Sequence, residues 1–137
     1  MLIRTLKVYI KMVVSVLYLT PSLKKADDIR LRDGLAAGDA YVGEIANKWA
    51  KARMKDIGSE VIVEGIENIP KDRNFVLIAN HQSNTDIFAV LATVDRPIAF
   101  VSKAELEKIP ILKTWMQELG CVFMNRSDIR QSMHSSK

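Results

Sequence analysis

The first twenty residues are apolar except for one narrow polar stripe. Arg4, Lys7, Lys11 and Ser15 recur at spacings of three and four, which gathers them on one side of a helix. The other side would be formed by large apolar residues: Leu2, Ile3, Leu6, Ile10, Val13, Val14 and Leu17. A basic stripe beside a wide apolar face is typical of a helix that lies in a membrane interface.

This helix is poorly suited to crossing a membrane. A spanning helix needs about 20 consecutive apolar residues, whereas the charge-free run from Met12 to Leu23 is shorter and contains Pro21. A signal peptide is disfavoured because Lys11 interrupts the apolar region. We therefore expect a membrane-associating helix, while packing on the chain's own domain and a true anchor remain open alternatives.

After this helix, residues 22–34 suit a surface connection or a second short helix, and residues 39–55 a longer helix that stops at Gly58. Short runs rich in β-branched and aromatic residues predict strands at 61–63, 75–79, 98–101 and 121–124. Helices are predicted between the last three strands, at 87–94 and at 106–119 with a break before Pro110. Strands joined by helices predict a parallel α/β sheet flanked by helices. We divide the chain into a membrane-associating segment, 1–34, and a domain, 35–137.

Charge and composition narrow the class of partner. Lysine and arginine exceed aspartate and glutamate by 20 − 16 = 4, and residues 1–30, with six basic and two acidic side chains, hold the whole excess. A basic excess at one end predicts contact with an anionic surface at that end, and not with nucleic acid. One cysteine and two distant histidines predict neither a disulfide nor a metal site, and give no sign of an oxidising compartment. We expect Cys121 to be buried and unreactive, and Trp49 and Trp115 to be core residues or membrane-boundary anchors.

Three predicted strands end in polar residues. Asn80 and His81 follow residues 75–79, Lys103 follows 98–101, and Arg126 follows 121–124. Because ligands bind beyond the carboxyl ends of parallel strands, these residues predict a proton acceptor beside a site for an anionic ligand.

His81 and Asp86 could form a pair. On one continuous helix they would lie about 140° apart, so contact requires a turn before a helix start. Ser83 or Asn84 could cap that helix and place Asp86 in its first turn, where it could orient the imidazole. The same residues would also suit an ordinary capped helix start beside a solvated histidine.

Four blocks of sequence carry a family resemblance. They are residues 80–86 (NHQSNTD), residues 64–70 (EGIENIP), Ser102, Lys103, Glu105 and Leu106 with Pro110, and Gly120, Phe123 and Arg126. In kind, order and spacing the chain resembles the glycerolipid acyltransferases, most closely the 1-acylglycerol-3-phosphate acyltransferases, over about residues 45–130.

The resemblance implies transfer of an acyl group from a thioester of coenzyme A or acyl carrier protein to lysophosphatidic acid. It implies His81 as general base and Asp86 as its orienting carboxylate, with Arg126, Lys103 and Asn80 binding the substrate. It implies co-substrates and no resident cofactor or metal, and a peripheral or monotopic place on the cytoplasmic face of the cell membrane.

The family continues with a block of the type Glu-Gly-Thr-Arg and another around a proline. Neither occurs in this sequence before Lys137. We therefore expect the chain to represent the N-terminal part of the fold, with the C-terminal part missing and a sheet edge exposed. Two alternatives stay open: a glycerol-3-phosphate acyltransferase, and an inactive membrane-binding fragment.

Overall fold

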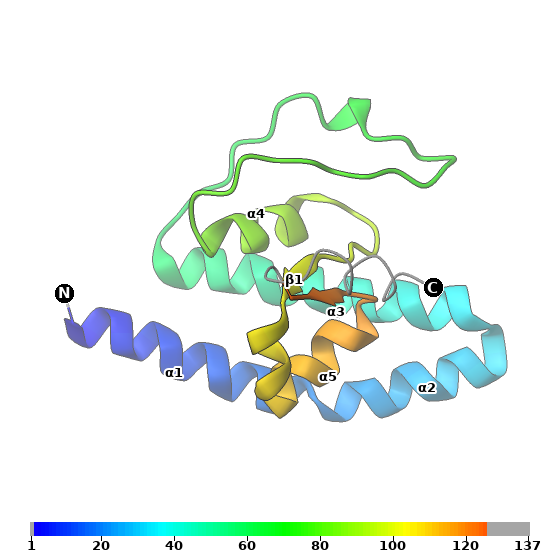
Figure 1. Ribbon diagram of the computed structural model, residues 1–137, viewed down its shortest axis with the longest axis horizontal. Helices are drawn as coiled ribbons and strands as arrows, with labels where there is room; N and C mark the ends of the chain where they lie inside the picture. Colours follow the sequence, from blue (N-terminus) through cyan, green and yellow to red (C-terminus); the bar gives the residue numbers. More distant parts are fainter. Residues whose placement is uncertain (1, 126–137) are drawn as a thin grey trace.

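The fold is built on one long central helix (Figure 1). The computed structural model describes residues 2–125, with side chains from residue 6. Three helices follow one another, α1 (Leu2–Leu19), α2 (Pro21–Asp33) and α3 (Leu35–Ile57). In Figure 1, α1 and α2 run along one side of α3, and α4 (Thr85–Thr93) lies along the other. The remaining elements are α5 (Pro110–Glu118), strands β1 (Val101–Lys103) and β2 (Val122–Met124), and two 3-10 helices, Ile66–Asn68 and Ala104–Lys108.

Proline and glycine set the helix boundaries. Pro21 opens α2, where its missing N–H is not needed. Gly58 ends α3 in the left-handed conformation, with φ of 73°. Pro110 opens α5 and separates it from the preceding 3-10 helix. The predicted helices at 39–55 and 87–94, the stop at Gly58 and the break before Pro110 are thus confirmed, and residues 22–34 form the second helix.

Two clusters of buried side chains hold α3 against its neighbours. Small residues dominate where α3 meets α4, so these two helices approach closely; the members are Ala46, Ala50, Met54, Leu91 and Ala92. The second cluster joins α2, α3 and α5 through Leu23, Ala26, Val42 and Trp115. This cluster crosses the predicted boundary at residue 34, and the division into 1–34 and 35–137 stays a prediction.

β1 and β2 form a parallel pair in which Lys103 lies opposite Met124. α5 connects the two strands, as expected for a parallel crossover. The predicted strand at 121–124 is confirmed within one residue, whereas the strand predicted at 98–101 lies at Val101–Lys103. The carbonyl oxygen of Phe100 accepts a hydrogen bond from the amide N–H of Val122 at 2.9 Å, so pairing begins just before β1.

The strands predicted at 61–63 and 75–79 are wrong for the described structure. Both segments belong to the long irregular excursion beyond α4 in Figure 1. Val76 is 85% exposed and Ile78 91% exposed. A strand that is apolar on both faces needs cover on both faces. Among the described residues, Val61 packs on the core but Val76 and Ile78 are left uncovered, and neither segment joins the β1–β2 sheet.

α1 packs on the rest of the chain by one side only. Val8, Met12, Ser15, Val16 and Leu19 on that side are partly buried. The opposite side, which we name the apolar arc, is exposed and comprises Leu6, Tyr9, Ile10, Val13, Val14 and Leu17. The packing on the chain's own domain that the sequence left open is therefore present, and it leaves the apolar face uncovered.

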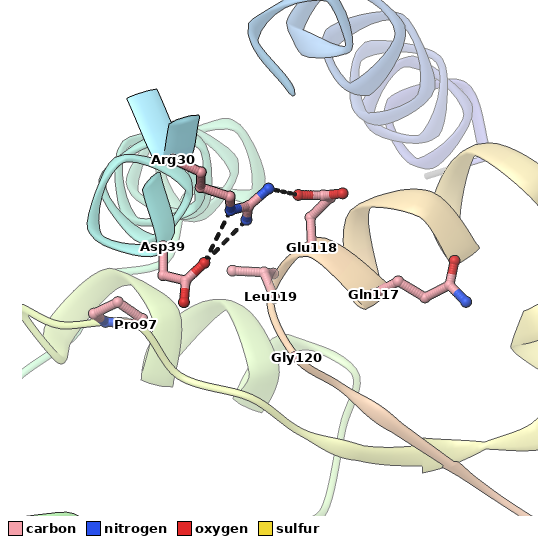
Figure 2. A pocket seen from close by; sticks show the side chains of 7 residues that line it. All are labelled: Arg30, Asp39, Pro97, Gln117, Glu118, Leu119 and Gly120. Atoms are coloured by element: carbon pink, nitrogen blue, oxygen red, sulfur yellow. Dashed lines mark hydrogen bonds and ion pairs between the residues drawn. The ribbon is translucent and has the colours of Figure 1, made fainter. Parts of the chain in front are cut away.

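Arg30 joins three helices. Its side chain is 16% exposed and lies between Asp39 on α3 and Glu118 on α5 (Figure 2). Nη1 donates to Glu118 Oε2 at 2.6 Å and to Asp27 Oδ1 at 2.9 Å, and Nη2 donates to Asp39 Oδ1 at 3.0 Å. The hydrogen bond to Glu118 is the main reason that the pKa of Arg30 is raised. Gly38 lies directly under this side chain, because any Cβ there would overlap Arg30 Cγ.

Candidate functional site

The start of α4 organises the loop that contains His81. The Asp86 amide N–H donates to the Ser83 carbonyl oxygen at 3.1 Å, which closes the first turn. Asn84 occupies the N-cap position without a side-chain capping bond. Instead Ser83 Oγ accepts from the Thr85 amide at 3.2 Å and from the Thr85 hydroxyl at 2.9 Å. This turn places Asp86 in the first turn of α4, as the sequence predicted.

One carboxylate oxygen of Asp86 makes hydrogen bonds to several residues of the loop before α4. Asp86 Oδ2 accepts from the backbone N–H groups of Gln82 at 2.7 Å and Ser83 at 2.9 Å. The bonds from Ser83 and Gln82 lower the pKa of Asp86 below its ordinary value, and the contact with His81 adds to this effect. The side chain is therefore a carboxylate at neutral pH and is held in one orientation by backbone donors.

His81 makes the predicted contact with Asp86. Its Nδ1 lies 3.1 Å from Asp86 Oδ2. Because a carboxylate only accepts, Nδ1 is assigned the proton, which leaves a lone pair on Nε2. The His81 side chain is 58% exposed, so Nε2 can be reached by a substrate. This arrangement is an oriented imidazole able to take a proton.

Of the other predicted site residues, Asn80 precedes His81 in the chain, and Lys103 lies on β1. Lys103 ends β1 and is exposed, and within residues 2–125 no ion pair or hydrogen bond joins it to His81. The Asn80 side chain is exposed and makes no hydrogen bond to another described residue. Arg126 lies outside the described residues. The expected common rim is missing because residues 75–79, which should bring Asn80 and His81 to it, do not pair with β1.

A cavity of about 400 Å³ lies at a different place, between the end of α5 and the α2–α3 pair (Figure 2). Arg30, Asp39 and Glu118 contribute its charged wall. Sequence reasoning missed Arg30, which stands in a mixed-charge segment that looks solvated. Gly38 could have indicated this position, because a glycine inside a helix leaves room for a large side chain from a neighbouring helix, here that of Arg30. Among the residues that the structure describes, no group of three metal-ligating side chains occurs.

Residues 60–137 match the family model described as Acyltransferase. A 1-acyl-sn-glycerol-3-phosphate acyltransferase of Borreliella burgdorferi is 33% identical over 75 residues, which are 55% of this chain and 30% of that protein. A 1-acyl-sn-glycerol-3-phosphate acyltransferase of Chlamydomonas reinhardtii is 38% identical over 90 residues, 65% of this chain and 26% of that protein.

A solved structure is similar over most of the described fold. The 1-acyl-sn-glycerophosphate (LPA) acyltransferase PlsC from Thermotoga maritima superposes with a TM-score of 0.78 and 38% identity. The superposition covers 89% of this chain and 49% of that chain. The α/β architecture with an apolar N-terminal helix is therefore that of a known fold, and the 137 residues correspond to about half of that solved chain.

Proposed function

Since this chain belongs to the acyltransferase family, we propose that it acts as a 1-acyl-sn-glycerol-3-phosphate O-acyltransferase. It would move a fatty acyl group from acyl-CoA or acyl carrier protein to lysophosphatidic acid, and so make phosphatidic acid for phospholipid biosynthesis. One observation carries the proposal: Nδ1 of His81 lies 3.1 Å from Asp86 Oδ2, while the imidazole side chain is 58% exposed.

In this reaction His81 is the general base. Its Nε2 takes the proton of the acceptor hydroxyl as the hydroxyl oxygen attacks the thioester carbonyl carbon. The carbon–sulfur bond then breaks, and the imidazolium returns the proton to the leaving thiolate, which restores His81. Proton transfer of this kind contributes about 10²–10⁴-fold in rate. Asp86 remains a carboxylate throughout and stabilises the imidazolium.

The acceptor phosphate requires cationic or polar partners. We assign this role to Arg126, Lys103 and Asn80, on the resemblance described above. Arginine suits a phosphate because its guanidinium donates two parallel hydrogen bonds. Lys103 would act as a point charge at the end of β1.

The catalytic role is tested by converting radiolabelled lysophosphatidic acid with acyl-CoA or acyl carrier protein as donor. We expect His81→Ala to lower the rate by about 10²-fold or more. His134→Ala removes the other histidine of the chain and should leave the rate unchanged. Conversion by His81→Ala at the unmodified rate would refute the role of His81. Competition between lysophosphatidic acid and glycerol 3-phosphate decides between the two acceptors.

We further propose that the apolar arc of α1 contacts the membrane from which lysophosphatidic acid is drawn. The run from Leu6 to Asp33 includes a window long and apolar enough to cross a membrane by length and composition. We favour a helix lying in the interface, on the cytoplasmic face, because basic residues accompany the arc and the chain shows no sign of an oxidising compartment.

Cosedimentation with phospholipid vesicles tests this contact. Ile10→Asp introduces a charge into the arc and should lower the bound fraction about tenfold, since buried charge is costly in lipid. Ile62→Asp is the control, because Ile62 is also an exposed isoleucine, at 83% against 53% for Ile10, but lies outside α1, between α3 and the 3-10 helix Ile66–Asn68. Equal loss in both variants would contradict a specific role for the arc.

A further inference from the structure

Two polar side chains of α1, those of Lys11 and Ser15, are bonded to α3. Ser15 Oγ accepts from Trp49 Nε1 at 2.8 Å and from Arg53 Nη1 at 2.6 Å. The same hydroxyl donates to the Met12 carbonyl oxygen at 2.8 Å. Every hydrogen-bonding direction of this hydroxyl is therefore used, and two of its three partners come from α3.

Arg53 extends this contact along α1. Its Nη1 also donates to the Lys11 carbonyl oxygen at 2.9 Å, and Nη2 lies 2.8 Å from Asp56 Oδ2. Asp56 Oδ1 in turn accepts from Lys11 Nζ at 2.9 Å. The Arg53 side chain is 12% exposed. We name Lys11, Ser15, Trp49, Arg53 and Asp56 the polar lock.

A second indole contacts the end of the same helix. Trp115 Nε1 on α5 lies 3.4 Å from the hydroxyl oxygen of Thr20, which follows α1. α1 is thus attached at two points, to α3 through Ser15 and to α5 through Thr20. Two attachments on one side prevent the helix from turning about its axis without breaking hydrogen bonds.

The lock explains why Ser15 faces the body while Lys11, which is 61% exposed, stays at its edge. It turns Ser15 toward α3 and leaves the opposite side of the helix apolar. A phospholipid bilayer with anionic headgroups fits this surface, because the arc is apolar and residues 1–30 carry a net charge of 6 − 2 = +4.

We propose that α1 stays docked on α3 through the polar lock when the arc enters a bilayer. Ser15, Trp49 and Arg53 are then positioning residues that hold the rest of the chain, including the His81–Asp86 pair, in one orientation to the lipid surface. A flexible tether would bind lipid equally well but would leave that orientation free. This inference rests on the membrane contact proposed above.

A cross-link between the two helices tests whether docking persists. Lys11→Cys and Asp56→Cys, made together with Cys121→Ser, place one thiol on each helix at the edge of the lock in place of the ion pair, and leave the contacts of Ser15 with Trp49 and Arg53 intact. Dibromobimane fluoresces when both thiols react, so it reports the docked state in solution and on vesicles of phosphatidylcholine and phosphatidylglycerol. We expect equal cross-linking in both conditions, and vesicle affinity within about twofold of the uncross-linked protein.

The outcomes separate this inference from the function. Loss of cross-linking on vesicles, or about tenfold weaker vesicle affinity after cross-linking, would show that α1 undocks and would overturn the inference while membrane contact stands. No vesicle binding by the unmodified chain would overturn the membrane contact and the inference together. Loss of acyl transfer in His81→Ala bears on catalysis alone, because His81 lies outside the lock.

A second measurement reads orientation directly. A donor dye on Lys51→Cys, in the Cys121→Ser background, transfers energy to acceptor-labelled lipid. In the Ser15→Ala, Arg53→Met double variant we expect vesicle binding to persist, and the donor–lipid distance distribution to broaden about twofold. Lys48→Met is the matched control, since it removes an exposed ion pair with Glu44 on the same helix. An unchanged distribution in a folded double variant would overturn the inference.

Discussion

Gly38→Ala should destabilise the protein, although alanine is the better helix former. An added Cβ would overlap Arg30 Cγ and come within 2.9 Å of the Ala26 carbonyl oxygen. The Arg30 side chain could move, but the Ala26 carbonyl belongs to the backbone of α2 and could move only with that helix. Substitution therefore forces α2 away from α3 and draws Arg30 away from Glu118.

The magnitude follows from three contributions. Overpacking costs about 1–3 kcal/mol, and a lost hydrogen bond between charged groups costs about 1.5–3 kcal/mol. Alanine in place of glycine returns about 1 kcal/mol of helix propensity. We expect a net loss of about 1.5–5 kcal/mol in the free energy of unfolding, which lowers the Tm by about 5–17 °C for a chain of this size.

Thermal and urea unfolding followed by circular dichroism at 222 nm measure this loss. Ala40→Gly is the control, because Ala40 is exposed in the same helix and reports helix propensity alone, with an expected loss of about 1 kcal/mol. The sign is decisive. A Gly38→Ala variant more stable than the unmodified protein would refute the close approach of α2 and α3 at this residue.

Three further predictions concern other sites. Asp86→Asn should lower acyl transfer by about 10²-fold or more. Since the pKa of Asp86 is lowered in the folded protein, the carboxylate should contribute stability above its ordinary pKa and lose that contribution as the pH falls through the folded pKa. A carboxyl NMR titration measures the folded pKa. Burial raises the pKa of the Cys121 thiol, so iodoacetamide at pH 8 should alkylate it at least about tenfold more slowly than in urea; equal rates would place it in solvent. Val42→Ala should cost about 2 kcal/mol of unfolding free energy, since Val42 is 1% exposed, and a loss below about 0.5 kcal/mol in urea unfolding would contradict that burial.

The sequence by itself determined the features that depend on near neighbours. Pro21, Gly58 and Pro110 set helix boundaries through their own backbone geometry. The contact between His81 and Asp86 was predictable for the same reason. It needs only a turn and a helix start within six residues, and the capping residues for that start stand between them.

Tertiary structure alone decided which polar residues turn inward and which strands pair. Ser15 looked like part of a solvated stripe, yet Trp49 and Arg53, 34 and 38 positions further on, bind its hydroxyl. Residues 75–79 have the composition of a strand, but a strand forms only when another backbone pairs with it, and composition does not supply that partner. Local geometry follows from the order of the residues, whereas burial and pairing depend on what distant segments bring alongside.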